Sequence, residues 1–420
     1  MKKIGRLVLI ICLIAVLALS AFGCKEKKKS EQLFDDRFDL TNKVLAFIEE
    51  NAYDDVDYDL VDLYAAYGLV YSLGDYNYLN AITEFFGAGS DKMGFGLLLK
   101  NNKYNEHIID TILPGSPFAT EAVGARRGDE IYAINGQRIS GLETAAYSAV
   151  VSATNALEPT TFLLKRGEET FEVTCTKAMV SFPNCIYVDD LEGVPTDFGY
   201  IRISSFENSS SIEKDFKNAV QSFNNDGNRA LILDLRGNGG GNSAVFATIA
   251  SALIGNVSVG TPLLEVQYAK QNRTSIVYTQ PAEYKIDAPV YVLCDGGTAS
   301  ASEALIGAMK AHGTLTSLIG QNTVGKGVAQ ITYTDGKNEY IIDKSTDSNG
   351  KEVNSLYHLQ VVVGKYYIYD NSVDGGKYCI HKKPFTPDVL IEDPNVISPD
   401  YSEDVYIAAA IEQYSSYKNS

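Results

Sequence analysis

The chain has 420 residues, of which 45% are hydrophobic, and its formal net charge is −17 at pH 7. A chain of this length and apolar content buries more than one core, so we expect two or three domains. The negative charge argues against nucleic acid as a partner, because phosphate backbones are bound through an excess of lysine and arginine.

The N-terminal segment 1–23 has the pattern of a secretion signal: a basic start, then an apolar run from Leu7 to Ala21 that is short for a membrane span. Cys24 follows this segment, which resembles a bacterial lipobox. We therefore expect lipidation of Cys24 and an exported lipoprotein held on a membrane of the cell envelope, on its periplasmic or extracellular face. Ordinary signal cleavage near this point and an uncleaved anchor are the alternatives.

Residues 24–91 read as a short charged tether followed by a helical N-terminal region. Leu40, Val44 and Phe47 recur at helical spacing, and a second set of apolar residues at the same spacing begins at Leu60. These patterns predict two helices before the chain changes character near residue 92.

Residues 92–180 contain short strands separated by turn signals, and the pair Asn135-Gly136 predicts a hairpin turn. With the run Gly128-Asp129-Glu130-Ile131 before that pair, this segment resembles a PDZ domain. Such a domain binds a partner's C-terminal tail as an added strand, and its opening loop holds the terminal carboxylate. The resemblance assigns this role to Gly94, Phe95, Gly96 and Leu97. Taken alone, the two glycines are equally compatible with a tight turn.

From residue 181 to 395 strands alternate with helices. A buried strand is expected over Val290 to Cys294 and a helix from Ala301 to about Ala311. The alternation predicts an α/β core with parallel strand pairing. A C-terminal helical segment is expected within residues 396–420.

Ser300 stands where this strand gives way to the helix, and Lys326 follows between two glycines. A serine hydroxyl becomes a good nucleophile when a neighbour takes its proton, and a lysine can do this at neutral pH if burial lowers its pKa. In isolation, Ser300 and Glu303 would be a helix capping box and Lys326 a surface residue. The glycine run that ends at Gly241 lacks the Gly-Lys-Ser/Thr of a phosphate-binding loop.

The order of three motifs favours catalysis: DLRGNGGG, then GGTASASE, then GKG. Together they resemble the C-terminal processing peptidases, also called tail-specific proteases, over roughly residues 65–389. The resemblance implies a crotonase-like (ClpP/crotonase-type) core with the PDZ-like domain inserted, no cofactor or metal, and protein substrates with apolar C-terminal tails. It assigns Ser300 as nucleophile, Lys326 as general base, Gln330 as the residue that orients the lysine, and the amides of Gly240 and Ala301 as the oxyanion hole. Ser302 is the alternative nucleophile.

Three alternatives to a serine-lysine protease exist. A related branch that resembles tricorn protease uses a histidine where this chain has Asn77, so a serine-histidine mechanism has no base here. A catalytically silent ligand- or peptide-binding lipoprotein on the same scaffold is the main alternative to a protease. An acyl-CoA enzyme of the crotonase type fits less well with an export signal and a PDZ-like insertion.

Overall fold

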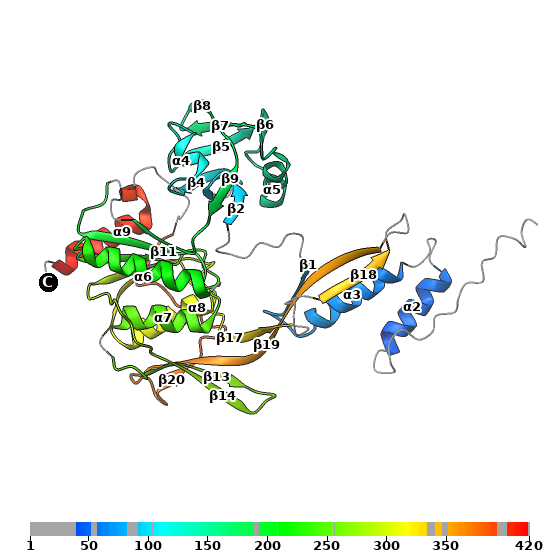
Figure 1. Ribbon diagram of the computed structural model, residues 1–420. Helices are drawn as coiled ribbons and strands as arrows, with labels where there is room; N and C mark the ends of the chain where they lie inside the picture. The colour runs from blue at the N-terminus through cyan, green and yellow to red at the C-terminus, as the bar shows by residue number, and fades with distance from the viewer. Residues whose placement is uncertain are drawn as a thin grey trace, which may run out of the picture. The chain divides into compact units, whose positions relative to one another are not determined.

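The computed structural model describes residues 39–51, 57–81, 91–101, 104–188, 191, 193–207, 209–255, 257–333, 341–346, 352–392 and 401–418 (Figure 1). The expected signal segment and Cys24 lie outside these residues. No helix in these ranges is long and apolar enough to cross a membrane. The chain divides into two units, one of Met1–Gly74 with Ser345–Val353 and one of Asp75–Lys344 with Asn354–Ser420.

The first unit contains helices α2 (Asp39–Asn51) and α3 (Tyr58–Tyr71). Asp57 caps α3, because its carboxylate accepts hydrogen bonds from the next helical amides, those of Asp59 and Leu60, at 3.1 Å each. The two helices are joined by a hydrogen bond from the Tyr58 hydroxyl to Glu49. No residue of α3 is buried.

The β-rich segment, residues 91–181, belongs to the second unit. Its strands are β2 (Asp91–Gly94), β3 (Leu97–Asn101), β4 (His107–Ile112), β5 (Glu130–Ile134), β6 (Gln137–Arg138), β7 (Thr160–Arg166), β8 (Glu169–Cys175) and β9 (Ala178–Ser181), with helices α4 (Pro117–Thr120) and α5 (Thr144–Ala153). The sheet order is β3-β4-β5-β7-β8, while β2 pairs with β9. Asn135 and Gly136 both have positive φ and link β5 to β6, which confirms the predicted hairpin turn.

A six-stranded sheet forms the centre of the second unit. Its order is β10 (Cys185–Val188), β11 (Phe198–Ile203), β12 (Ala230–Asp234), β15 (Val290–Cys294), β16 (Leu315–Gly320) and β21 (Val389–Leu390). Only the β10 and β11 pair is antiparallel within this sheet. The mixed α/β fold with parallel pairing is therefore confirmed.

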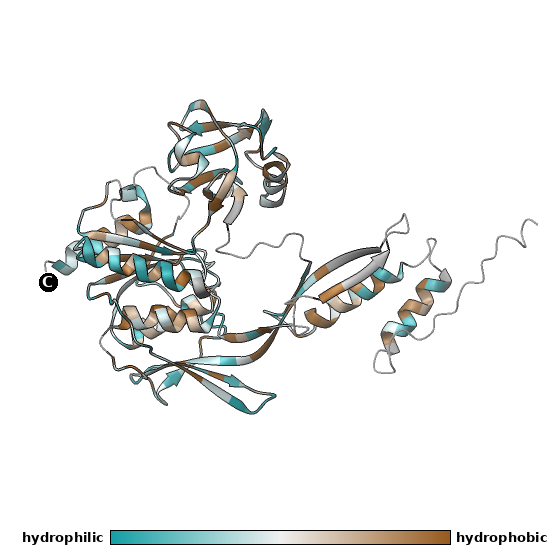
Figure 2. Cartoon of the chain, viewed as in Figure 1, coloured by the Kyte–Doolittle hydropathy of each residue, from teal (hydrophilic) through white to brown (hydrophobic). Residues whose placement is uncertain are grey.

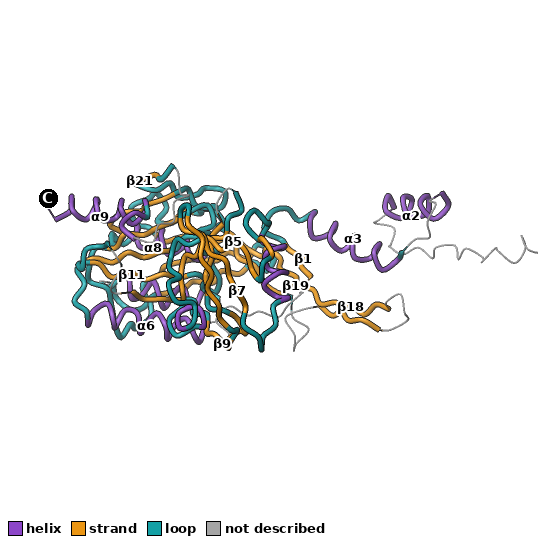
Figure 3. The backbone as a smooth tube through the Cα atoms, turned by 90° about the horizontal axis from the view of Figure 1, so that it is seen from above, coloured by secondary structure: helices purple, strands orange, loops and turns teal. Residues whose placement is uncertain are grey.

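Helices cover both faces of this central sheet (Figure 1, Figure 3). On one face lie α6 (Ser209–Asn225), α7 (Ser243–Ile254) and α8 (Ala301–Ala311), and on the other lie the short helix η2 (Tyr401–Glu403) and α9 (Val405–Lys418). Alternate residues of β12 serve the two faces: Leu231 and Leu233 pack with α6–α8, whereas Ile232 packs with α9. Because both faces are covered, every residue of β12 is buried.

A second sheet packs on the opposite side of α7 and α8. It consists of β1 (Tyr78–Ala81), β13 (Pro262–Tyr268), β14 (Arg273–Tyr278), β17 (Val328–Thr332), β18 (Ile341–Thr346), β19 (Glu352–Tyr369) and β20 (Lys377–Tyr378), and five of these strands contact the long strand β19 directly. Leu264 of β13 and Ile368 of β19 join the same hydrophobic core as α7 and α8. Figure 2 shows α7 with mostly apolar residues, as its position between two sheets requires.

Candidate active site

Ser300 lies in a tight turn between β15 and α8. Its backbone angles are φ 57° and ψ −116°, and the N–H of Ser302 donates to the carbonyl of Ala299 at 3.1 Å. These angles belong to the first central position of a type II′ turn, where glycine is usual. A serine in this conformation costs about 1–3 kcal/mol. An ordinary helix cap has extended angles, so capping alone does not account for the conformation of Ser300.

Glu303 connects the turn of Ser300 to the loop of Lys326. Its side chain is fully buried in the first turn of α8. One carboxylate oxygen accepts the N–H of Ser300 at 3.0 Å and the N–H of Lys326 at 2.8 Å. The other accepts the N–H of Gly325 at 2.7 Å and the hydroxyl of Thr323 at 2.5 Å. Four donors stabilise this buried carboxylate. Two of them are the backbone N–H groups of Ser300 and Lys326, so one side chain holds both catalytic candidates.

Lys326 lines the same pocket as Ser300, and its ammonium nitrogen lies 5.7 Å from the ring centroid of Tyr76. Burial lowers the pKa of Lys326 below that of an ordinary lysine, while the carboxylates of Glu207 and Glu303 act in the opposite direction. A lowered pKa is what a lysine needs to act as a base. Among the described residues, no hydrogen bond joins Lys326 Nζ to Ser300 Oγ.

Gln330, on β17, lies in this pocket as well. Its side-chain amide donates to the backbone carbonyl of Tyr76, a residue that itself has a φ of 68°. The structure therefore brings Gln330 close to the site but engages its amide with Tyr76 rather than with Lys326.

The glycine-rich loop after β12 packs directly against the serine turn. Gly240 has a φ of 98°, and a Cβ atom there would lie 2.7 Å from the Cβ of Ser300 and 2.7 Å from the amide nitrogen of Ala301. Only glycine allows this approach. The N–H of Ala301 has no protein acceptor in the described part of the chain. The N–H of Gly240, by contrast, donates to Asn238 Oδ1 at 2.9 Å.

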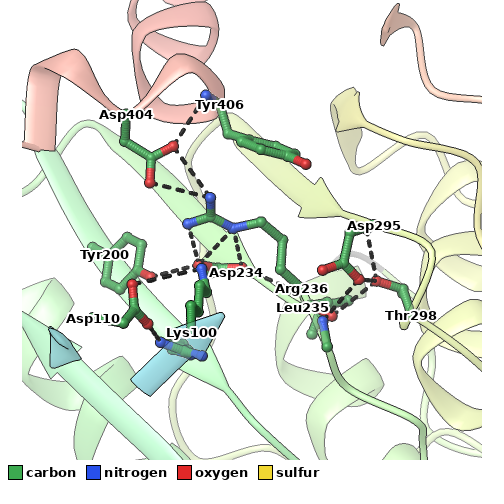
Figure 4. Close-up of polar contacts among 12 residues, drawn as sticks. Lys100, Asp110, Tyr200, Asp234, Leu235, Arg236, Asp295, Thr298, Asp404 and Tyr406 are labelled. Carbon is green, nitrogen blue, oxygen red and sulfur yellow. Dashed lines mark hydrogen bonds and ion pairs between the residues drawn. The ribbon is translucent and has the colours of Figure 1, made fainter. Parts of the chain in front are cut away.

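The glycine-rich loop is anchored at its start by buried charges (Figure 4). The Arg236 guanidinium bonds Asp234 at 2.6–3.0 Å and Asp404, at the start of α9, at 3.1 Å. Burial alone would raise the pKa of Asp234, but Arg236 outweighs this and holds that pKa well below its usual range. At the next residue, the amide of Gly237 donates to Asp295 at 2.8 Å.

Asp404 also links this anchor to the β-rich segment, because it accepts a hydrogen bond from Arg127 at 3.0 Å. Arg127 and Arg202 both pair with Asp110 of β4, and Lys100 lies 3.5 Å from the same carboxylate. The β-rich segment is thereby held to the central sheet through buried ion pairs.

Ser300, Lys326 and Gln330 open into one pocket of about 610 Å³. Its wall combines Glu207 and the glycine-rich loop with apolar side chains of α7, β13 and β17, namely Phe246, Leu264, Val266 and Val328. Within the described ranges, no three potential metal ligands cluster together. The pocket thus brings together a serine, a partly buried lysine and a backbone amide, that of Ala301, which has no protein acceptor among the described residues.

Sequence reasoning missed two residues that contact this site. The ring of Tyr76 lies near Lys326 Nζ, and its backbone carbonyl accepts from Gln330. The hydroxyl of Tyr366, on β19, lies within hydrogen-bond distance of the backbone carbonyls of Ser300 and Lys326. The run of β-branched and aromatic residues in β19 is a signal for a strand. It gives no indication of which of its tyrosines meets the serine turn.

Comparison with known proteins finds a family match for the catalytic part of the chain and several similar proteins. Residues 197–391 match the model of peptidase family S41. The carboxy-terminal processing protease CtpA of Bacillus subtilis is 26% identical over 97% of this chain and 81% of its own length. A carboxyl-terminal-processing protease of Synechocystis sp. is 28% identical over 76% of this chain and 67% of its own length. A crystal structure of an S41-class protein from Bacteroides fragilis shares the fold, with a TM-score of 0.59 over 87% of this chain and 93% of that one at 17% identity. Residues 197–391 therefore form a peptidase family S41 domain, and the chain as a whole is similar to carboxy-terminal processing proteases.

Proposed function

We propose that the chain is a serine endopeptidase in which Ser300 is the nucleophile and Lys326 the general base. The observation that carries this proposal is that a strained serine and a lysine with a lowered pKa share one pocket and one carboxylate anchor, Glu303. Ser302 is a poor candidate, because its hydroxyl is buried and donates to the carbonyl of Asn238 at 3.0 Å.

In the mechanism, neutral Lys326 accepts the proton of the Ser300 hydroxyl as Oγ attacks the peptide carbonyl. The N–H of Ala301 faces the developing oxyanion, and one such donor is typically worth about 3 kcal/mol. The lysinium then protonates the leaving amine. Water, activated by the same lysine, releases the acyl group from Ser300.

The proposal requires small movements when substrate binds. Gly240 completes the oxyanion hole when its N–H leaves Asn238, and Gln330 orients Lys326 when its amide leaves Tyr76. Catalytic hydrogen bonds often form fully only in the substrate complex, so a resting site with other partners is compatible with activity.

The test is cleavage of an unfolded protein by three variants. Ser300→Ala and Lys326→Ala should each abolish cleavage, because the two residues act as a unit. Ser302→Ala should retain it. An active Ser300→Ala enzyme would mean that another residue is the nucleophile. A wild-type chain that cleaves nothing would favour the catalytically silent binding protein, an alternative that the intact pocket disfavours.

We further propose that the β-rich segment acts as a PDZ-like domain inserted in a crotonase-like core and selects substrates by apolar C-terminal tails. β3, which begins directly after Phe95 and Gly96, is an end strand of its sheet and can accept a peptide strand. A Cβ on Gly96 would lie 2.0 Å from the Cβ of Ser116, so the backbone of the opening loop packs tightly against Ser116. Equal cleavage of free-tailed and amidated substrates would contradict tail selection.

Export and lipid anchoring at Cys24 complete the proposal. They rest on the sequence pattern of residues 1–24. A Cys24→Ser chain should appear in the soluble fraction of cells, and equal membrane association of both chains would count against a lipid anchor.

A further inference from the structure

The main-chain groups of both catalytic candidates are held by the same two side chains, Glu303 and Tyr366. The N–H groups of Ser300 and Lys326 donate to one oxygen of Glu303, at 3.0 and 2.8 Å. The hydroxyl oxygen of Tyr366 lies 2.9 Å from the carbonyl oxygen of Ser300 and 2.7 Å from that of Lys326, so its one proton is shared between the two carbonyls. Ser300 and Glu303 lie at the start of α8, Lys326 lies in the loop before β17, and Tyr366 lies on β19.

Tyr366 is well placed for such a role. It lies on β19 in the hydrophobic core between α8 and the second sheet, with 4% of its surface exposed, and its ring lines the active-site pocket. Burial raises its pKa well above that of a free tyrosine, so the hydroxyl keeps its proton and remains a donor. The strained backbone of Ser300 persists only where its surroundings determine it, and the two side chains supply that constraint.

We infer that Glu303 and Tyr366 form a clamp that sets the position of Lys326 relative to Ser300, with Tyr366 a positioning residue for the proposed peptidase reaction. This inference rests on the proposed roles of Ser300 and Lys326. Ser300 lies at the start of α8 and Lys326 in the loop before β17. Glu303 and Tyr366 hydrogen-bond to the backbone of both segments. If one segment shifts relative to the other, the distance between Lys326 Nζ and Ser300 Oγ changes. Proton transfer then suffers, because it requires these atoms to come within hydrogen-bond distance.

The test compares Tyr366→Phe with Tyr291→Phe in the full chain. Tyr291 is a fully buried tyrosine of β15 whose hydroxyl has no hydrogen-bond partner in the described structure, so it is a matched control. Steady-state kinetics are measured on fluorescently labelled casein at a temperature where thermal unfolding curves show every variant folded. Tyr366→Phe keeps the ring and removes only the hydroxyl.

We expect Tyr366→Phe to lose about tenfold to a hundredfold in kcat with KM within about twofold of wild type, because a small misplacement of reacting groups has effects of this size. Tyr291→Phe should stay within about twofold in both parameters. A merely structural hydroxyl would lower the unfolding temperature and leave kcat of the folded enzyme unchanged. Wild-type kcat in folded Tyr366→Phe would overturn the clamp.

If Tyr366→Phe does not fold, Thr323→Val provides the test. This isosteric change removes one donor from Glu303 and leaves Tyr366 in place. A several-fold fall in kcat at unchanged KM supports the clamp, and an unchanged kcat overturns it. Ser300→Ala separates the two claims: if it cleaves casein at the wild-type rate, the proposed function fails, whereas an inactive Ser300→Ala beside a fully active Tyr366→Phe means that the clamp alone is wrong.

Discussion

Lys326 is subject to opposing influences, and their balance sets the pH range of the proposed reaction. Burial lowers its pKa, and the nearby carboxylates of Glu207 and Glu303 oppose that effect. Glu303 accepts the hydrogen bonds that hold the Ser300 turn and the Lys326 loop together. Glu207, by contrast, lies on the exposed wall of the pocket. A substitution at Glu207 can therefore change the pKa of Lys326 without removing the hydrogen bonds to Glu303.

Glu207→Gln should shift the rising limb of the pH profile of kcat/KM to lower pH. Neutral lysine is the active form, so activity rises as the pH passes the pKa of Lys326, and removing a negative charge lowers that pKa further. Glu412→Gln, at an exposed carboxylate on α9, is the control and should leave the profile in place. If the rising limb of the Glu207→Gln profile lies at the same pH as in wild type, or at a higher pH, Lys326 is not the titrating base.

At the level of elements, the loop after β12 packs so closely against the turn before α8 that almost no space is left between them. The positive φ of Gly240 and the 2.7 Å approach of its hypothetical Cβ to Ser300 leave no room for a side chain. Gly296, in the adjacent loop after β15, has open space around it and no positive φ. The two glycines are a natural pair for comparison.

Gly240→Ala should reduce kcat by about a hundredfold or more, because it displaces the serine turn and the oxyanion loop together. It should also lower the free energy of unfolding by about 1–3 kcal/mol through backbone strain and overpacking. Gly296→Ala should change neither value appreciably. Kinetics on casein and urea unfolding measure the two effects, and a fully active Gly240→Ala enzyme would refute the proposed packing of the site.

The two elements on either side of Ser300 were predictable from local signals. The expected strand Val290 to Cys294 and helix Ala301 to Ala311 coincide with β15 and α8, because apolar runs, helix-forming residues and glycine boundaries are local in sequence. The second sheet was not predicted. Its long strand β19 brings Tyr366 to Ser300, which lies 66 positions earlier in the chain, and no periodicity encodes such a contact. The positive φ of Ser300 was equally hidden, since serine does not signal it.

For the whole molecule, the buried ion pairs around Asp110 hold the β-rich segment to the central sheet. Burial would raise the pKa of Asp110, but Lys100, Arg202 and Arg127 reverse this and lower it. The unfolded chain has an ordinary aspartate pKa near 3.9. The stabilisation is therefore fully present above about pH 4 and is lost as the pH falls further, through the lowered pKa of the folded state.

Asp110→Asn should lower the free energy of unfolding at pH 7 by about 3–5 kcal/mol, because it removes the carboxylate that Lys100, Arg127 and Arg202 share, and in the described part of the chain only Arg127 keeps a second one, Asp404. The variant should also lose less stability than wild type between pH 4 and pH 2. Asp374→Asn, at an exposed position, is the control. Urea unfolding followed by circular dichroism measures both effects, and equal stability of Asp110→Asn and wild type at pH 7 would show that these ion pairs contribute little.

The central claim is that Ser300, activated by Lys326, forms the acyl-enzyme. The most direct measurement is mass spectrometry of enzyme quenched during turnover of an activated peptide ester. The account predicts an acyl group on Ser300, located by fragmentation of the peptide that contains both Ser300 and Ser302, and no acyl group in Lys326→Ala. An acyl group on Ser302, or rapid turnover with no acylated serine, would contradict it.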